Sequence, residues 1–146
     1  GSRVIFHGHE PVSAMPDVQR RADILFLALA VNSPHPEIVK TAMPGKMGEY
    51  LASGRPILVH APPDSFISWY FRHYECGVVV DENDPRQLAT AINSILTDAA
   101  LRERVCARAR ERALVDFDHL KERKRFFEVL ERGISETPHV LTETLT

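Results

Sequence analysis

The chain has 146 residues, of which 44% are hydrophobic and 26% are charged, as is typical of one soluble globular domain. Its formal net charge of -2 gives no electrostatic reason to expect nucleic acid or an anionic membrane as the main partner. No apolar run approaches the roughly 20 residues that cross a bilayer. The two cysteines, Cys76 and Cys106, form no Cys-x-x-Cys pair, which favours separate reduced thiols in a cytosolic protein.

Short apolar runs bounded by turn-forming residues predict β-strands. The run from 24 to 29 is almost continuously apolar, as expected of a parallel strand that is covered on both faces. Gly54-Arg55-Pro56 and Gly77 precede two further β-branched runs, which is the usual punctuation of α/β loops. We therefore expect strands at residues 4–6, 24–29, 57–59 and 78–80.

Helix signals fall between and after these runs. Gly54 stands where a left-handed C-terminal cap would end one helix, and Asp64 or Ser65 can cap the next. Asp84-Pro85 combines an N-cap residue with proline at the first helical position. We expect helices at about 45–53, 66–73, 85–96, 99–115 and 118–132, and a polar tail from 135 to 146.

Strands that alternate with helices predict an α/β fold, a parallel Rossmann-like sheet with helices on both faces. Such sheets bind ligands at the carboxyl ends of their strands, where helix N-termini point inward. The segment 42–57 has this form, because a loop with proline and glycine precedes a short helix, a glycine stop and a strand. It is the most informative part of the chain.

The start of that helix carries residues suited to a nucleotide. Its free N–H groups and positive dipole end attract phosphate oxygens, and Gly45 allows the backbone to approach closely. Lys46 adds a full positive charge, and Glu49, one turn further, can direct a carboxylate into the same cleft to accept hydrogen bonds from a ribose diol. The alternative is that Lys46 and Glu49 form an ordinary exposed helix pair, worth about 0.2–0.5 kcal/mol.

A resemblance to a known family rests on the run Pro44-Gly45-Lys46 and Glu49-Tyr50-Leu51-Ala52-Ser53-Gly54-Arg55-Pro56-Ile57. It is similar to the donor-site signature of retaining glycosyltransferases of the GT-B fold, in a P-x-K-x-x-E-Y-L-A-x-G-x-P variant of their Glu-x7-Glu motif. Flanking runs also resemble the family's V-x-F-x-G strand, its A-D-I/V-L strand and its G-V-V-V-D and D-P segments. The resemblance covers about residues 3–130.

The resemblance implies that residues 1–134 form the carboxyl-terminal, donor-binding domain of such an enzyme. The parent would transfer a hexosyl or related group, with retention of configuration, from a nucleoside-diphosphate sugar to a hydroxyl of an acceptor glycan, lipid or small molecule. It implies no cofactor, no essential metal and no nucleic-acid partner. The parent would be cytoplasmic, with peripheral attachment to the inner face of a membrane as the alternative.

The resemblance also assigns roles to individual residues. Glu49 is similar to the second glutamate of the motif, which holds the ribose. The backbone of Gly45 and Lys46, with the Lys46 ammonium, would contact the diphosphate, and Pro44 and Met47 belong to the same substrate-binding run. No catalytic residue is assigned.

Two further places are expected near the donor. Gly8 and His9 follow the first predicted strand, where family members hold the edge of the base. Thr41 stands eight residues before Glu49, where most members carry the first glutamate, which contacts the donor sugar. We expect Thr41 near the sugar, although Glu37 could substitute if the loop were rearranged.

The chain departs from the family at its beginning. The first two strands of the family's carboxyl-terminal domain and the whole amino-terminal domain are not seen, and Gly1-Ser2 is typical of a cloning scar. We therefore expect a fragment that does not transfer sugar alone. Its strand at 4–6 would have to pair abnormally, either with the strand at 24–29 or with another chain, because an unpaired edge strand invites partnering.

Other interpretations compete with this one. Thr41 motivates a non-catalytic nucleotide- or partner-binding module that kept the fold, whereas a receiver-like signalling domain would need an acidic cluster that the first strand lacks. His7, His9 and Glu10 are too few for a convincing metal site. Core packing is the better interpretation of the aromatic residues at 69, 70, 71 and 74, and a solvated face is the better interpretation of the arginines at 102, 104, 108, 110 and 112.

Overall fold

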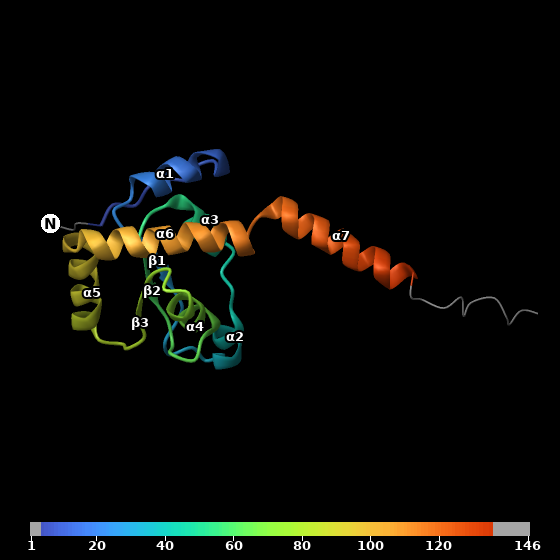
Figure 1. The fold of residues 1–146 in the computed structure, drawn as a ribbon. Helices are drawn as coiled ribbons and strands as arrows, with labels where there is room; N and C mark the ends of the chain where they lie inside the picture. Colours follow the sequence, from blue (N-terminus) through green and yellow to red (C-terminus); the bar gives the residue numbers. More distant parts are fainter. Residues whose placement is uncertain (1–3, 136–146) are drawn as a thin grey trace, which may run out of the picture.

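The computed structural model describes residues 4–135, and its centre is a three-stranded parallel sheet (Figure 1). The strands are β1 (Leu25–Ala28), β2 (Ile57–His60) and β3 (Val78–Val80), in the order β1-β2-β3. Val59, at the centre of β2, aligns with Leu27 on one side and with Val79 on the other. The strands predicted near 24–29, 57–59 and 78–80 are confirmed.

The strand predicted at residues 4–6 is wrong. Residues 4–11 adopt no regular secondary structure, and Val4, Ile5 and Phe6 are 64%, 76% and 92% exposed. The run does not pair with β1, whose ladder joins it to β2. Three apolar residues do not make a strand without a neighbouring ladder. Pairing of this segment with another chain stays a prediction.

A helical segment that we did not predict follows. The 3-10 helix η1 (Val12–Ala14) leads directly into α1 (Met15–Arg21). Pro16 and Asp17 lie in the first turn of α1, and arginines lie in the last, so both ends suit the helix dipole.

Two short helices connect β1 to β2. They are α2 (Pro36–Thr41) and α3 (Met47–Ser53). The predicted glycine cap of α3 is confirmed, because Gly54 has φ 74° and a Cβ there would run into the Arg110 guanidinium. The helix begins at Met47, two residues later than expected, with Lys46 as its N-cap residue.

The remaining helices match their sequence signals. Ser65 caps α4 (Phe66–His73) by accepting a hydrogen bond from the Ser68 N–H, and Asp84 caps α5 (Pro85–Thr97) through the Arg86 N–H. The long helix α6 (Ala99–Asp116) follows, and then α7 (His119–Ser135).

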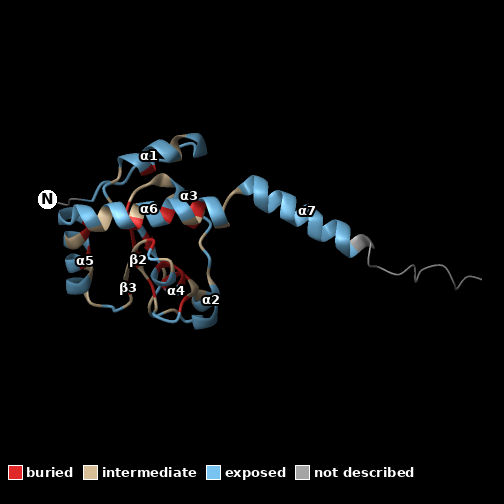
Figure 2. Ribbon diagram, viewed as in Figure 1, coloured by how far each residue is buried: buried red, intermediate tan, exposed pale blue. Residues whose placement is uncertain are grey.

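Helices cover both faces of the sheet, as predicted for an α/β fold. Successive residues of β2 point to opposite faces, so Ile57 and Val59 belong to one core cluster and Leu58 belongs to the other. The larger cluster contains buried residues of α3, α4 and α6, and the smaller one contains Ala91 and Ile95 of α5. Figure 2 shows the buried residues gathered around the strands and the helices beside them.

The last described helix, α7, projects from this body, and none of its residues with a described side chain is buried (Figures 1 and 2). Ser135 still belongs to α7, and the rest of the predicted tail, 136–146, lies outside the described residues. Among the described helices, none combines the length and the hydropathy that crossing a bilayer requires.

Candidate functional site

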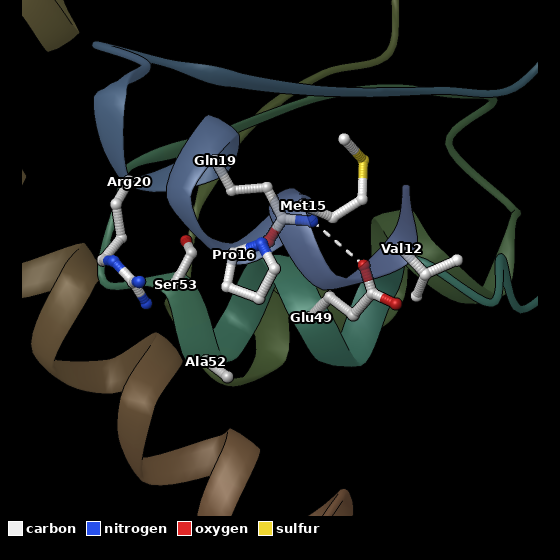
Figure 3. Close-up of a pocket in the computed structure, with 8 residues that line it drawn as sticks. All are labelled: Val12, Met15, Pro16, Gln19, Arg20, Glu49, Ala52 and Ser53. Carbon is white, nitrogen blue, oxygen red and sulfur yellow. Dashed lines mark hydrogen bonds between the residues drawn. The ribbon is translucent and has the colours of Figure 1, made fainter. Parts of the chain in front are cut away.

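A pocket of about 300 Å³ opens between η1–α1 and α3 (Figure 3). Helix α1 packs beside α3, which brings residues separated by some thirty positions in the sequence to one surface. We call it the α1–α3 pocket; it is lined by Val12, Met15, Pro16, Gln19, Arg20, Glu49, Ala52 and Ser53.

Glu49 is the carboxylate of this pocket. It lies in the first turn of α3 and is exposed, so a ligand can reach it. The Gln19 side-chain Nε2 donates a hydrogen bond of 2.9 Å to Glu49 Oε2, drawn as a dashed line in Figure 3. Gln19 itself is only 9% exposed, so α1 holds this amide in a fixed place against the carboxylate.

The turn before α3 is open to solvent. Gly45 and Lys46 are exposed, and a Cβ placed on Gly45 would meet no described atom within 4 Å. Within the turn, the Met47 N–H donates a hydrogen bond of 2.9 Å to the Pro44 carbonyl. The amino end of α3 is therefore accessible, as the sequence analysis required.

Lys46 and Glu49 do not form the ordinary helix pair that was the alternative interpretation. In the part of the chain that the structure describes, no ion pair joins them, and Glu49 instead accepts from Gln19. The Lys46 ammonium lies 5.5 Å from the centre of the Tyr50 ring. Among the described residues, no acidic side chain forms an ion pair with Lys46.

The structure places one residue of the predicted site in the core. Met47 is 0% exposed, packs in the larger core cluster and does not line the α1–α3 pocket. The reason is helical geometry, because Met47 and Leu51 share the face of α3 that is turned to the core. Pro44 is half-buried in the adjoining turn.

The predicted sugar-side and base-side residues do not line the α1–α3 pocket. Thr41 is the last residue of α2, and its hydroxyl donates to the Glu37 carbonyl at 3.0 Å. Gly8 and His9 lie in the exposed irregular segment. The pocket wall instead comes from residues just after them, beginning at Val12.

The sequence analysis missed the α1 side of the pocket. The residues missed are Val12, Met15, Pro16, Gln19 and Arg20. Their spacing of three and four, with a proline and an acid early and arginines late, is a helix signal that could have been found. Nothing in that pattern, however, says that the Gln19 amide meets Glu49.

Other groups with possible chemistry have structural surroundings. Burial raises the pKa of the Cys76 thiol to about 12, so the thiol stays protonated at neutral pH. Tyr70 and Phe71 are buried, which confirms core packing for these two aromatics, whereas Trp69 is 52% exposed and stacks on His73. Among residues 4–135, no group of three or more His, Cys, Asp or Glu side chains could hold a metal ion.

Comparison with known proteins gives one family. The family model described as "Glycosyl transferases group 1" matches residues 1–112, which is more than half of the chain and includes β1–β3, the α1–α3 pocket and the turn before α3. No curated protein and no solved structure matches the chain.

Proposed function

The chain belongs to the group 1 glycosyltransferases, and from this premise we propose that its α1–α3 pocket and the turn before α3 bind the nucleoside diphosphate part of a sugar donor. The family supports a role in glycosyl transfer, with a nucleotide sugar and an acceptor as the bound molecules. The kind of donor and the role of each residue belong to this proposal.

The observation that carries the proposal is the state of Glu49. Its carboxylate lies in an open pocket, and a neutral amide fixes one oxygen, while no ion pair to Glu49 is formed within residues 4–135. A carboxylate offers about four lone-pair sites, so Glu49 can accept from both hydroxyls of a ribose in addition to Gln19. Val12, Met15 and Pro16 provide an apolar wall beside it.

The diphosphate fits the turn at Gly45 and Lys46. Glycine leaves room for phosphate oxygens to approach the backbone, and the Lys46 ammonium is exposed and without an ion-pair partner among the described residues. When the bond to the sugar breaks, negative charge develops on the leaving diphosphate. A lysine held at that place would stabilise the charge most in the transition state.

The proposed reaction transfers a hexosyl or related group from the nucleoside-diphosphate sugar to an acceptor hydroxyl of a glycan, a lipid or a small molecule. We propose retention of configuration and no cofactor or essential metal. We also propose that these 146 residues bind nucleoside diphosphates without transferring sugar by themselves. A cytoplasmic location, with or without attachment to a membrane face, is part of the same proposal.

A second candidate function is a binding module without chemistry. The Thr41 hydroxyl is bonded to its own helix, and no carboxylate of α2 lines the pocket, so the usual contact to the donor sugar has no counterpart there. Assay of the full-length protein with a panel of nucleotide sugars separates the two. Transfer or hydrolysis would exclude the binding module.

The proposal is tested first by calorimetric titration of the chain with uridine, guanosine and adenosine diphosphates. For Lys46→Ala, we expect the affinity for the preferred diphosphate to fall by about ten- to a hundredfold, because a hydrogen bond to a charged group is worth about 1.5–3 kcal/mol. The affinity for the corresponding nucleoside should change little. Lys124→Ala, which removes the same charge from the projecting helix α7, is the matched control.

Equal losses for the nucleoside and its diphosphate would mean that Lys46 supports the fold and does not contact phosphate. If none of the three diphosphates binds the unmodified chain in the millimolar range, the pocket is not a donor site and the proposal fails.

A further inference from the structure

We propose that Gln19 is a positioning residue for Glu49 and that this pair makes the pocket discriminate ribonucleoside from 2′-deoxyribonucleoside diphosphates. The inference rests on the proposed function, because it assigns to Glu49 the ribose of the donor. It adds two points to that function: Gln19 on α1 acts through Glu49, and the two residues together recognise the 2′ hydroxyl of the ligand.

The position of Gln19 in the fold indicates a role toward Glu49. It is the buried residue of α1, at the helix position that faces α3, where an apolar side chain would pack without cost. A buried amide loses its hydrogen bonds to water, and the loss must be compensated by a partner. The partner at 2.9 Å is Glu49 Oε2, so the amide serves the carboxylate rather than the packing.

The Gln19 amide that donates the hydrogen bond to Glu49 is uncharged. An arginine or lysine at this place would neutralise Glu49 and take up its lone pairs, whereas the neutral amide takes one and leaves the negative charge. Glu49 Oε1 and the remaining lone pairs of Oε2 are then available for ligand hydroxyls. The arrangement therefore keeps the carboxylate a strong acceptor while it fixes the direction in which it points.

The Gln19 hydrogen bond also reduces the conformational entropy that the Glu49 side chain loses when a ligand binds. A glutamate on the exposed side of a seven-residue helix samples several rotamers, and stopping that motion on binding would cost affinity. The amide on α1 fixes the carboxylate before the ligand arrives. Preorganisation of this kind strengthens only those contacts that need the fixed oxygen, which here are the ribose hydroxyls.

The test compares ribo- and 2′-deoxyribonucleoside diphosphates of uracil, guanine and adenine in calorimetric titrations. For Gln19→Met, which keeps the length of the side chain but removes the hydrogen-bond donor, we expect the affinity for the ribose forms to fall roughly tenfold. The affinity for the deoxy forms, which keep only the 3′ hydroxyl of the diol, should fall clearly less. The ratio of the two affinities therefore collapses toward one. A role in stability alone would weaken both forms equally and leave the ratio unchanged.

The chain offers a matched control. Gln87 is the other glutamine of the sequence, and its Nε2 also donates to a glutamate, Glu82 Oε2, at 2.6 Å on the exposed start of α5. It lines no part of the α1–α3 pocket. Gln87→Met should leave both the affinities and their ratio unchanged, and a matching fall of the ratio there would overturn the inference.

A second variant gives a readout that packing cannot imitate. Gln19→Glu sets two carboxylates against each other at neutral pH, so the ribose preference should be lost. At lower pH the pair shares one proton, a donor to Glu49 returns, and the preference should recover. Arg20 lines the same pocket and pairs with Asp17. Both residues are unchanged in wild type and in Gln19→Met, so titrations of these two proteins over the same pH range measure any pH effect that does not come from residue 19.

The outcomes separate this inference from the proposed function. If Glu49→Gln abolishes the ribose preference but Gln19→Met preserves it, the positioning role is wrong and the donor site stands. If Glu49→Gln also preserves it, the ribose role of Glu49 fails, and the proposed function fails with it. Should Gln19→Met not fold, a ribose preference of Gln19→Glu that does not vary with pH overturns the inference by itself.

Discussion

At the scale of single residues, a network of polar side chains centred on Asp116 lies outside the candidate site. The Tyr70 hydroxyl donates to Asp116 Oδ2 at 2.5 Å, and the Arg112 guanidinium binds both oxygens of the same carboxylate. Arg112 also lies 3.9 Å from the centre of the Tyr74 ring. This network joins α4 to the carboxyl-terminal end of α6, and burial together with the Asp116 bond raises the pKa of Tyr70, which keeps its hydroxyl a donor.

The network makes stability depend on pH in a defined direction. Burial alone would raise the pKa of Asp116, but the hydrogen bonds from Arg112 and Tyr70 outweigh it and hold that pKa below its ordinary value of 3.8. Because the folded pKa is the lower one, the stabilisation is complete above about pH 4–5 and is lost as pH falls through the folded pKa. We expect Asp116→Asn to lower the free energy of unfolding at pH 7 and to flatten its fall in acid.

Urea unfolding of wild type and Asp116→Asn between pH 3 and pH 7 measures this difference. Glu111→Gln, which breaks the exposed pair with Arg108 on the same helix, is the control and should cost little. Parallel pH curves for wild type and Asp116→Asn would contradict the assignment.

At the scale of elements, the junction of α5 and α6 is fixed by a single residue that serves both helices. Asp98 ends α5 and caps α6, because its Oδ1 accepts from the Leu101 N–H at 2.9 Å. Arg102 reaches back to the carbonyls of Ile95 and Leu96, the last turn of α5. The corner therefore satisfies helix ends that would otherwise lack partners.

Loss of this cap should be measurable. We expect Asp98→Ala to lower the free energy of unfolding by about 1 kcal/mol, as for other N-cap carboxylates. Thermal or urea unfolding gives the value, with Thr97→Ala one residue earlier as a control within about 0.5 kcal/mol of wild type. Equal losses of unfolding free energy for Asp98→Ala and Thr97→Ala would show that any change at the α5–α6 junction destabilises the fold and that the cap hydrogen bond is not the cause.

At the scale of the whole molecule, the described side chains of α7 take no part in the buried core of the body. The body holds every buried residue among those described, whereas α7 exposes apolar side chains along its length, namely Leu120, Phe126, Phe127, Val129 and Leu130. The family match also ends within α6, at residue 112. A helix that buries none of its described side chains contributes little hydrophobic stabilisation.

Removal of residues 119–146 tests this separation. We expect the shortened chain to unfold in one cooperative transition, with a melting temperature within about 3 °C of the whole chain and unchanged affinity for nucleoside diphosphates. Calorimetric scans and titrations give both quantities. A lower melting temperature or weaker binding would mean that α7 stabilises the body in solution.

Much of this architecture follows from local patterns. Some sequence signals determine only the structure of their immediate neighbours, so that structure could be predicted. Examples are the apolar runs of β1, β2 and β3, the aspartate and proline that begin α5, and the glycine that ends α3. The interpretation of the arginines as a solvated face was only partly right, because Arg102 binds the Ile95 carbonyl of α5 and Arg112 binds Asp116, one turn further along α6.

The sequence by itself determined the α/β class and the family, since each depends on residue types at short, fixed spacing. The roles of Lys46 and Glu49 follow from the same kind of pattern and stay predictions. Only the tertiary structure decided that Met47 turns into the core, that residues 4–6 form no strand, and that Gln19 meets Glu49 across two helices. The physical reason is that pairing, burial and hydrogen bonding between distant segments depend on which surfaces the fold brings together, and no local pattern contains that information.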